Sequence, residues 1–335
     1  IENTGATIGG RPLYLHTEVV DSIPMSVSRA KKDITPSRGT ITTNPADIGI
    51  SAVVFDGDKN AWPNAEKTAE AQMYMHNEKL TSPWQTNRYW PRENDWIRFY
   101  AYSPYNILGE NGLPVISTIE PSFSYTVDND VTKQQDLLVG SEQYEGGWCR
   151  IAPLDMSHAL AAVRIHIAGA VTQFTLKSVT ISGLKNSGTY TYKYNPANYS
   201  VDANGNKVKT HDEGSWTGLS YVGDGTSASY NVFSGTRELT GTGGKDVNGN
   251  DNVKFFDEED VSGYVDATPG NMVLLMMPQE LTTDAKITIT GEDGVLKLLD
   301  GIEDRYAYFL EVLAYTKYNG DTVTFTSKTE GTLAK

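Results

Sequence analysis

The sequence predicts an all-β protein that consists of two β-sandwiches in tandem. Short runs of alternating apolar and polar residues recur along its 335 residues, as in strands with one buried face. Tyrosine (19 residues) and glycine (31 residues) are abundant, and Asp-Gly, Asn-Gly and Gly-Gly pairs separate the runs as hairpin turns do. Many short strands with regular turns are typical of sandwiches or partly closed barrels rather than of a wound α/β sheet.

The alternating runs predict the order of the strands along the chain. Strands are expected at residues 13–20, 49–55, 96–102, 122–127, 162–167, 174–181, 189–194, 227–233, 272–277, 285–290, 306–313 and 322–326. Two short alanine-containing stretches, 65–71 and 158–162, are weak helix candidates. The second could equally be the start of a strand.

A boundary between the two sandwiches is predicted near residue 150. The segment 140–153 combines glycines, a proline and a polar run, and a new alternating run begins beyond it. The N-terminal domain is therefore expected to span residues 1–150 and the C-terminal domain residues 151–335. Between residues 198 and 266 the second domain carries long polar stretches, which predict extended hairpins or surface loops.

The most acidic of these stretches, residues 245–266, holds seven carboxylates against two lysines. Within it, the Asp and Asn spacing of residues 246–257 is similar to that of a calcium-binding EF-hand loop. However, Asp251 stands where that loop needs a glycine, and Asp257 stands where it needs a glutamate. A polar hairpin turn is therefore the favoured interpretation and a calcium loop the alternative.

The charge of the chain argues against nucleic-acid binding. The chain has 28 Lys+Arg against 42 Asp+Glu, a formal net charge of -14, whereas phosphate binding needs clustered Lys and Arg. Arg29, Lys31 and Lys32 form a short basic cluster after the first run, but three cations are too few to bind nucleic acid. The cluster is interpreted either as an exposed tether or as a plain solvated turn.

The sequence contains no recognisable catalytic or metal-binding motif. Cys149 is the single cysteine, so neither an intramolecular disulfide nor a cysteine-based metal site is expected within one chain. The HExxH, GxSxG, Walker and GxGxxG motifs do not occur, and His158 is interpreted as a packed or capping residue rather than a ligand. We therefore expect neither enzymatic activity nor a cofactor. No run of about 18 apolar residues predicts a membrane-spanning helix.

An aromatic-rich segment, residues 84–106, has two interpretations. Its three tryptophans and four tyrosines include Trp84 and Trp90, which could form a platform on which sugar rings stack. Residues 97–102, however, alternate as a half-buried strand does, with a sandwich core on one side. Core packing is the favoured interpretation, and a glycan-binding surface at Trp84 and Trp90 is the alternative.

Four segments stand in an order that is typical of one family. They are WIRFYAYSPYN (96–106), DLLVGSEQ (136–143), PLDMSHALAAVRIHI (153–167) and MVLLMMPQELTTDAKITIT (272–290). Together they resemble the fimbrillin-like proteins of Bacteroidales, which comprise the FimA/Mfa-type subunits of type V pili and their relatives. The opening PLYLHTEVV…SVSRA is similar to the first strand of that family and the Arg-Ala that follows it. Two features depart from the family: LLDGIEDRYAYFLEV (298–312) lacks a tryptophan, and the loops in 198–266 are long.

The resemblance implies two transthyretin-like Greek-key β-sandwich domains and a lipoprotein precursor exported to the outer membrane. It also implies proteolysis after a basic residue beyond the first strand, with Arg29 as the favoured site and Lys31, Lys32 and Arg38 as rivals. Removal of the first strand would open an apolar groove that a strand from a neighbouring subunit fills. The expected partners are therefore other pilus subunits and, at the cell surface, host or bacterial ligands.

The side chains involved in this exchange are expected from the alternation of the two strands. The removable strand would present Leu13, Leu15, Thr17 and Val19 to the core, and the donor run 322–326 would present Val323 and Phe325. A sandwich that lacks one strand has unpaired edges and an apolar stripe, which an added strand covers. Head-to-tail addition of this kind yields a filament. The competing interpretation is a surface glycan-binding lipoprotein that keeps its first strand and does not polymerise.

Overall fold

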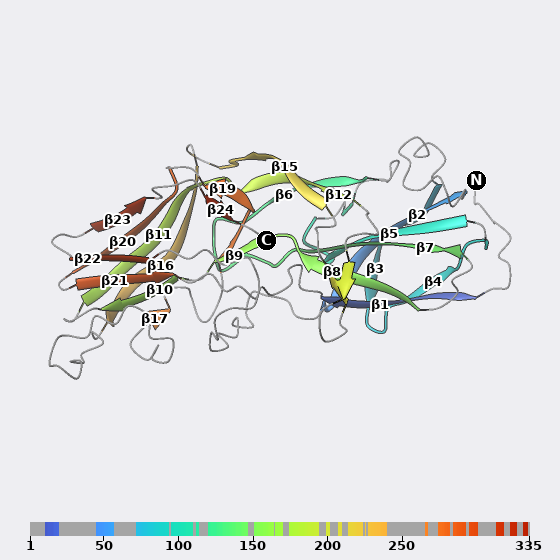
Figure 1. Cartoon of the computed structure of the whole chain (residues 1–335), viewed down its shortest axis with the longest axis horizontal. Helices are drawn as coiled ribbons and strands as arrows, with labels where there is room; N and C mark the ends of the chain where they lie inside the picture. Colours follow the sequence, from blue (N-terminus) through green and yellow to red (C-terminus); the bar gives the residue numbers. More distant parts are fainter. Residues whose placement is uncertain are drawn as a thin grey trace.

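The computed structural model shows an elongated protein built from β-strands (Figure 1). It describes residues 11–19, 45–56, 72–93, 95–109, 112–113, 120–146, 151–163, 165–169, 174–193, 199–201, 207–209, 214–223, 225, 227–239, 265–266, 274–281, 284–292, 295–300, 313–317, 322–326 and 331–333. Every regular element within these ranges is a β-strand, so the all-β class is confirmed for the described residues. The largest sheet lies at one end of the long axis, two four-stranded sheets lie at the other end, and a three-stranded sheet lies between them.

The largest sheet has seven strands in the order β3-β2-β5-β7-β8-β1-β4. They are β1 (Pro12–Val19), β2 (Asp47–Asp56), β3 (Gln72–Thr81), β4 (Gln85–Tyr89), β5 (Asp95–Ser103), β7 (Leu138–Glu145) and β8 (Ala152–His158). All neighbours are antiparallel except β1 and β8, which run parallel. The alternation of the sequence predicts β1, β2 and β5, whereas the other four strands of this sheet were not predicted.

Strand β5 is buried on both faces, although its alternation predicts a core on one face only. Phe99 and Ala101 point into the core that the seven-stranded sheet encloses, while Tyr100 and Tyr102 belong to a second core on the opposite face. Arg98 is 1% exposed, and its guanidinium lies over the Tyr100 ring at 5.7 Å from the ring centre. Burial raises the pKa of Tyr100 and of Tyr102 to about 12. The outer face is covered because aromatic residues from the second half of the chain pack against it.

The edge strands β3 and β4 contact each other through side chains, so the seven-stranded sheet curls around its core. Tyr74 of β3 donates a hydrogen bond to the carbonyl of Tyr89 in β4, and burial raises the pKa of the Tyr74 hydroxyl. Arg88 of β4 pairs with Glu78 of β3 at 2.6 Å. The enclosed core comprises Leu13, Leu15, Ile48, Ile50, Ala52, Met75, Leu80, Trp84, Trp90, Ile97, Phe99, Ala101, Leu138, Ala152, Leu154 and Met156. The curl agrees with the partly closed barrel that the strand pattern allowed.

The remaining strands form smaller sheets. The three-stranded sheet has the order β15-β12-β6, and the four-stranded sheets have the orders β17-β10-β21-β22 and β16-β11-β20-β23. Their strands are β6 (Ser122–Thr126), β10 (Ile165–Gly169), β11 (Phe174–Leu184), β12 (Ser187–Tyr192), β15 (Gly214–Ser220), β16 (Ala228–Leu239), β17 (Val265–Asp266), β20 (Lys286–Glu292), β21 (Val295–Asp300), β22 (Leu313–Lys317) and β23 (Thr322–Thr326). Three pairs of short strands complete the fold: β13 (Tyr199–Val201) with β14 (Lys207–Lys209), β9 (Ala161–Val163) with β18 (Leu274–Met276), and β19 (Gln279–Leu281) with β24 (Gly331–Leu333).

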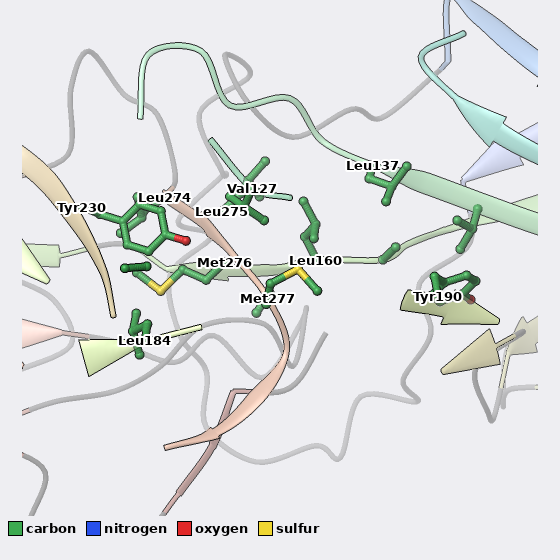
Figure 2. Close-up of a cluster of buried hydrophobic side chains, with 14 of the residues drawn as sticks. Val127, Leu137, Leu160, Leu184, Tyr190, Tyr230, Leu274, Leu275, Met276 and Met277 are labelled. Carbon is green, nitrogen blue, oxygen red and sulfur yellow. The ribbon is translucent and has the colours of Figure 1, made fainter. Parts of the chain in front are cut away.

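Strands from both sides of residue 150 share sheets and a core. Strand β8 follows that residue yet joins the first sheet, and β6 pairs with β12 of the second half. Figure 2 shows part of the shared core, in which Val127, Leu160 and Met276 gather from distant parts of the chain. The domain division at residue 150 stays a prediction.

The two helix candidates have different outcomes. The candidate at 158–162 is wrong, because His158 ends β8 and Ala161 begins β9. The main chain of His158 pairs with β7 and that of Ala161 and Ala162 pairs with β18, so these residues lie in strands. The candidate at 65–71 lies outside the described residues, as does the acidic stretch 245–264 with its proposed calcium loop.

Two buried amide side chains, those of Asn186 and Gln134, bond the main chain of distant segments. Asn186 is 1% exposed, and its side chain bonds both main-chain groups of Val222, donating to the carbonyl at 3.0 Å and accepting from the amide at 2.9 Å. It also donates to the side-chain oxygen of Asn129 at 3.1 Å. The side-chain oxygen of Gln134 accepts from the amide of Leu275 at 2.8 Å. The bonds of Asn186 to Asn129 and of Gln134 to Leu275 join segments that precede residue 150 to segments that follow it.

Replacement of Asn186 by alanine is expected to lower the free energy of unfolding by about 2–4 kcal/mol. The main-chain groups of Val222 would lose their partner, and a buried space would form. Urea unfolding followed by circular dichroism measures the change. Asn231→Ala, at an exposed position of β16, is the matched control. It should change the free energy of unfolding by about 0.5 kcal/mol or less. Equal effects of the two substitutions would contradict this role of Asn186.

Candidate functional site

Strand β1 presents one face to the core and one to solvent, as the alternation of its sequence predicts. Leu13, Leu15 and Thr17 are 0%, 3% and 7% exposed. Between them, Tyr14 is 39% exposed and His16 is also exposed. Val19 lies in β1 by its backbone, and its side chain lies outside the described set. This burial pattern makes β1 part of the wall around the first core.

The hydrogen bonding of β1 is divided between two strands along its length. Its first part pairs antiparallel with β4, where Pro12 lies opposite Tyr89 and Tyr14 lies opposite Gln85. Its second part, residues 15–19, pairs parallel with residues 152–156 of β8. The first part of β1 is thus paired with β4 and the second part with β8.

Further bonds fix β1 against the segment around β4. The amide of Leu15 donates to the carbonyl of Trp84 at 3.2 Å, and the amide of Trp90 donates to the carbonyl of Arg11 at 3.1 Å. The hydroxyl of Thr86 donates to the carbonyl of Leu13 at 2.9 Å. The seat of β1 is therefore built from residues 84–90 on one side and from β8 on the other.

The two strands that pair with β1 differ in how clearly their sequences predict a strand. In β8, the apolar residues Ala152, Leu154 and Met156 alternate along the strand and are fully buried, so the sequence of β8 does contain a strand pattern. In β4, Thr86 is the one buried residue among exposed polar or aromatic neighbours. Nothing in such a pattern reveals a strand, because β4 is formed by its hydrogen bonds to β1 rather than by an apolar face.

The predicted cleavage residues cannot be placed against β1. Arg29, Lys31, Lys32 and Arg38 all lie outside the described residues, in the connection between β1 and β2. Their assignment as cleavage site and rivals stays a prediction.

The predicted donor run coincides with strand β23. Its backbone pairs antiparallel with β20, from Thr322 opposite Thr290 to Thr326 opposite Lys286. Strand β23 is at the edge of its sheet, since β20 is its single neighbour among the described strands. The side chains of Val323 and Phe325 lie outside the described set. As a donor, this strand would have to leave β20.

The glycan-binding alternative at Trp84 and Trp90 requires a correction. The two residues are 7% and 3% exposed and belong to the core inside the seven-stranded sheet. Trp90 packs edge-on against Tyr144, with ring centres 6.1 Å apart. Buried rings offer no face to a sugar, so these tryptophans form no ligand surface in this structure. Their burial agrees with the favoured interpretation, core packing.

His158 is a packed residue, as the sequence indicated. Its Nδ1 lies 2.8 Å from a carboxylate oxygen of Asp136, and both side chains are buried. Within the described part of the chain, no group of three or more His, Cys, Asp or Glu side chains is placed to hold a metal ion. The same part contains no helix that is long and apolar enough to cross a membrane.

Comparisons with known proteins give one long match and one short one. A family model described as fimbrillin-like matches residues 29–333, so the match begins at Arg29 and leaves β1 outside it. A dITP/XTP pyrophosphatase of Methanopyrus kandleri is 44% identical over 45 residues, which are 13% of this chain and 24% of that enzyme. No solved structure matches the chain. The short match carries no activity to this chain, and the expectation that it is not an enzyme stays a prediction.

The two faces of β1 predict opposite sensitivities to truncation. Leu15→Ala is expected to lower the free energy of unfolding by about 2–5 kcal/mol, because it leaves a cavity in the first core. Tyr14→Ala, one residue away on the exposed face, should cost about 1 kcal/mol or less. Urea unfolding measures both, and hydrogen exchange of the β1 amides should accelerate only in Leu15→Ala. Similar losses in both variants would contradict the placement of β1.

Proposed function

Because the chain belongs to the fimbrillin-like family, we propose that it is a fimbrial subunit that polymerises when a neighbouring subunit's strand replaces its β1. Family membership supports a cell-surface fimbrial protein in general, which assembles with other pilus subunits. The strand replacement, the cleavage that starts it and the lipid anchor are parts of the proposal. The observation that carries it is the seat of β1, which combines backbone pairing on two sides with buried side chains.

Loss of β1 would expose a site of the shape that an added strand needs. Strand β8 would lose its parallel neighbour, and β4 would lose its ladder partner. The positions of Leu13, Leu15 and Thr17 would become pockets in the wall of the first core. A donor strand supplies ladder hydrogen bonds to the edges and alternate side chains to the pockets. Such an addition links one subunit to the next in a chain that does not close.

The edge position of β23 supports it as the donor. A strand that is bonded on one side only can be peeled away with less loss than a central strand. Val323 and Phe325 occupy alternate positions, as Leu13 and Leu15 do in β1. Strand β23 of one subunit would then leave β20 and enter the groove that β1 vacates in the next subunit.

Two finer features belong to the same proposal. The two halves of the chain would each be a transthyretin-like Greek-key sandwich, and the precursor would be a lipoprotein held at the outer membrane. Neither feature is needed for the strand replacement, whose acceptor groove lies in the first sheet.

The competing function is a non-polymerising glycan-binding lipoprotein of the cell surface. With Trp84 and Trp90 buried, its ligand would have to use other aromatic residues. Among the described residues, Tyr14 on β1 and Tyr89 on β4 are exposed aromatic candidates, with exposed fractions of 39% and 44%. Glycan binding by the uncleaved chain that is lost in Tyr89→Ala, without polymer formation after cleavage, would favour this function.

Controlled proteolysis tests the proposed function. An arginine-specific protease should cut the folded chain after Arg29, and the product should form polymers that light scattering and electron microscopy detect. Arg29→Gln should remain uncut there and monomeric, whereas Arg38→Gln, the matched control, should behave as the parent does. A lysine-specific protease reports on the rivals Lys31 and Lys32 in the same way. A clean cut that leaves a permanent monomer contradicts the proposal.

A further inference from the structure

Two buried threonines on neighbouring strands of the first sheet differ in their hydrogen bonding. Thr86 of β4 is 8% exposed; its hydroxyl donates to the carbonyl of Leu13 at 2.9 Å and accepts from the amide of Arg88 at 3.1 Å. Thr17 of β1 is 7% exposed, and its hydroxyl oxygen is buried with no hydrogen-bond partner in the structure described here. The first hydroxyl therefore bonds β4 to β1, and the second bonds to none of the described residues.

A buried hydroxyl without a partner destabilises the strand that carries it. The group gives up its bonds to water when β1 enters the sheet and receives none in return. A valine has the same branched shape with a methyl group in place of the hydroxyl, so it would fill the position without this loss. Leu13 and Leu15, by contrast, place apolar side chains in the core at 0% and 3% exposure.

We propose that Thr17 is the residue that keeps β1 replaceable, and that the strand which takes its place carries an aliphatic side chain at this position. The inference rests on the strand replacement proposed above and adds the property that selects the incoming strand. Thr17 lies opposite Leu154 in the parallel ladder with β8, so the selective position adjoins the β8 edge. An incoming strand that carries apolar side chains at the positions of Leu13 and Leu15, as β1 does, displaces β1 because it also carries an apolar side chain at the position of Thr17.

The first experiment uses the intact chain and does not depend on polymerisation. Thr17→Val is expected to raise the melting temperature by about 2–4 °C. Hydrogen exchange of the β1 amides should slow by about fivefold or more. Thr86→Val is the matched control and should lower the melting temperature, since it removes the bonds to Leu13 and Arg88. A fall or no change in Thr17→Val overturns the proposal, because the hydroxyl is then satisfied in solution.

The second experiment measures replacement directly. The chain is cleaved after Arg29 and mixed with fluorescent ten-residue peptides of residues 11–20, one with threonine and one with valine at position 17. The valine peptide should enter the cleaved protein at about fivefold lower concentration than the threonine peptide, as fluorescence anisotropy reports. Equal concentrations for both peptides overturn the selective role of Thr17.

A third outcome separates this inference from the function on which it rests. Failure of both peptides to enter the cleaved protein contradicts strand replacement, and with it the replaceability of β1. The thermal and hydrogen-exchange measurements on intact Thr17→Val still report whether the hydroxyl destabilises β1. Failure of strand replacement can therefore be distinguished from failure of the inference about Thr17.

Discussion

The closed shape of the first sheet depends on β1, whose hydrogen bonds are divided between β4 and β8. Strand β4 has no other ladder partner among the described strands, so β1 is its connection to the sheet. The side-chain contacts between β3 and β4 close the curl at the opposite edge. One strand therefore completes both the hydrogen-bonded wall and the apolar core of this half of the protein. An element with that position is also the one whose exchange would link two copies most firmly.

Contacts outside β1 hold together the framework on which this strand lies. Strand β5 has cores on both faces, and the side chains of Asn186 and Gln134 bond segments from the two halves of the chain to each other. The hydrogen bonds of Asn186 and Gln134 involve neither β1 nor β4, so loss of β1 would leave them in place. The remaining framework would hold the vacated groove in shape, which lowers the entropic cost of binding an incoming strand.

Much of the fold followed from residue alternation, and the failures have physical reasons. The core face of β1 was predicted because Leu13, Leu15 and Thr17 alternate with polar residues. The second buried face of β5 was not, since tyrosines and Arg98 are also common on solvent-facing strands. Strand β4 has no apolar pattern at all and exists through its pairing with β1. The missing partner of the Thr17 hydroxyl depends on tertiary surroundings, which no local pattern encodes.

A reversible disulfide across β1 and β4 tests most directly whether β1 must leave its seat. Tyr14 and Gln85 are exposed and directly opposite in the antiparallel register, so Tyr14→Cys with Gln85→Cys can join the strands, in a Cys149→Ser background. After cleavage at Arg29, the oxidised protein should stay monomeric by light scattering, and reduction should restore polymers to the level of Cys149→Ser alone. Equal polymerisation of the oxidised and reduced forms would contradict the replacement of β1.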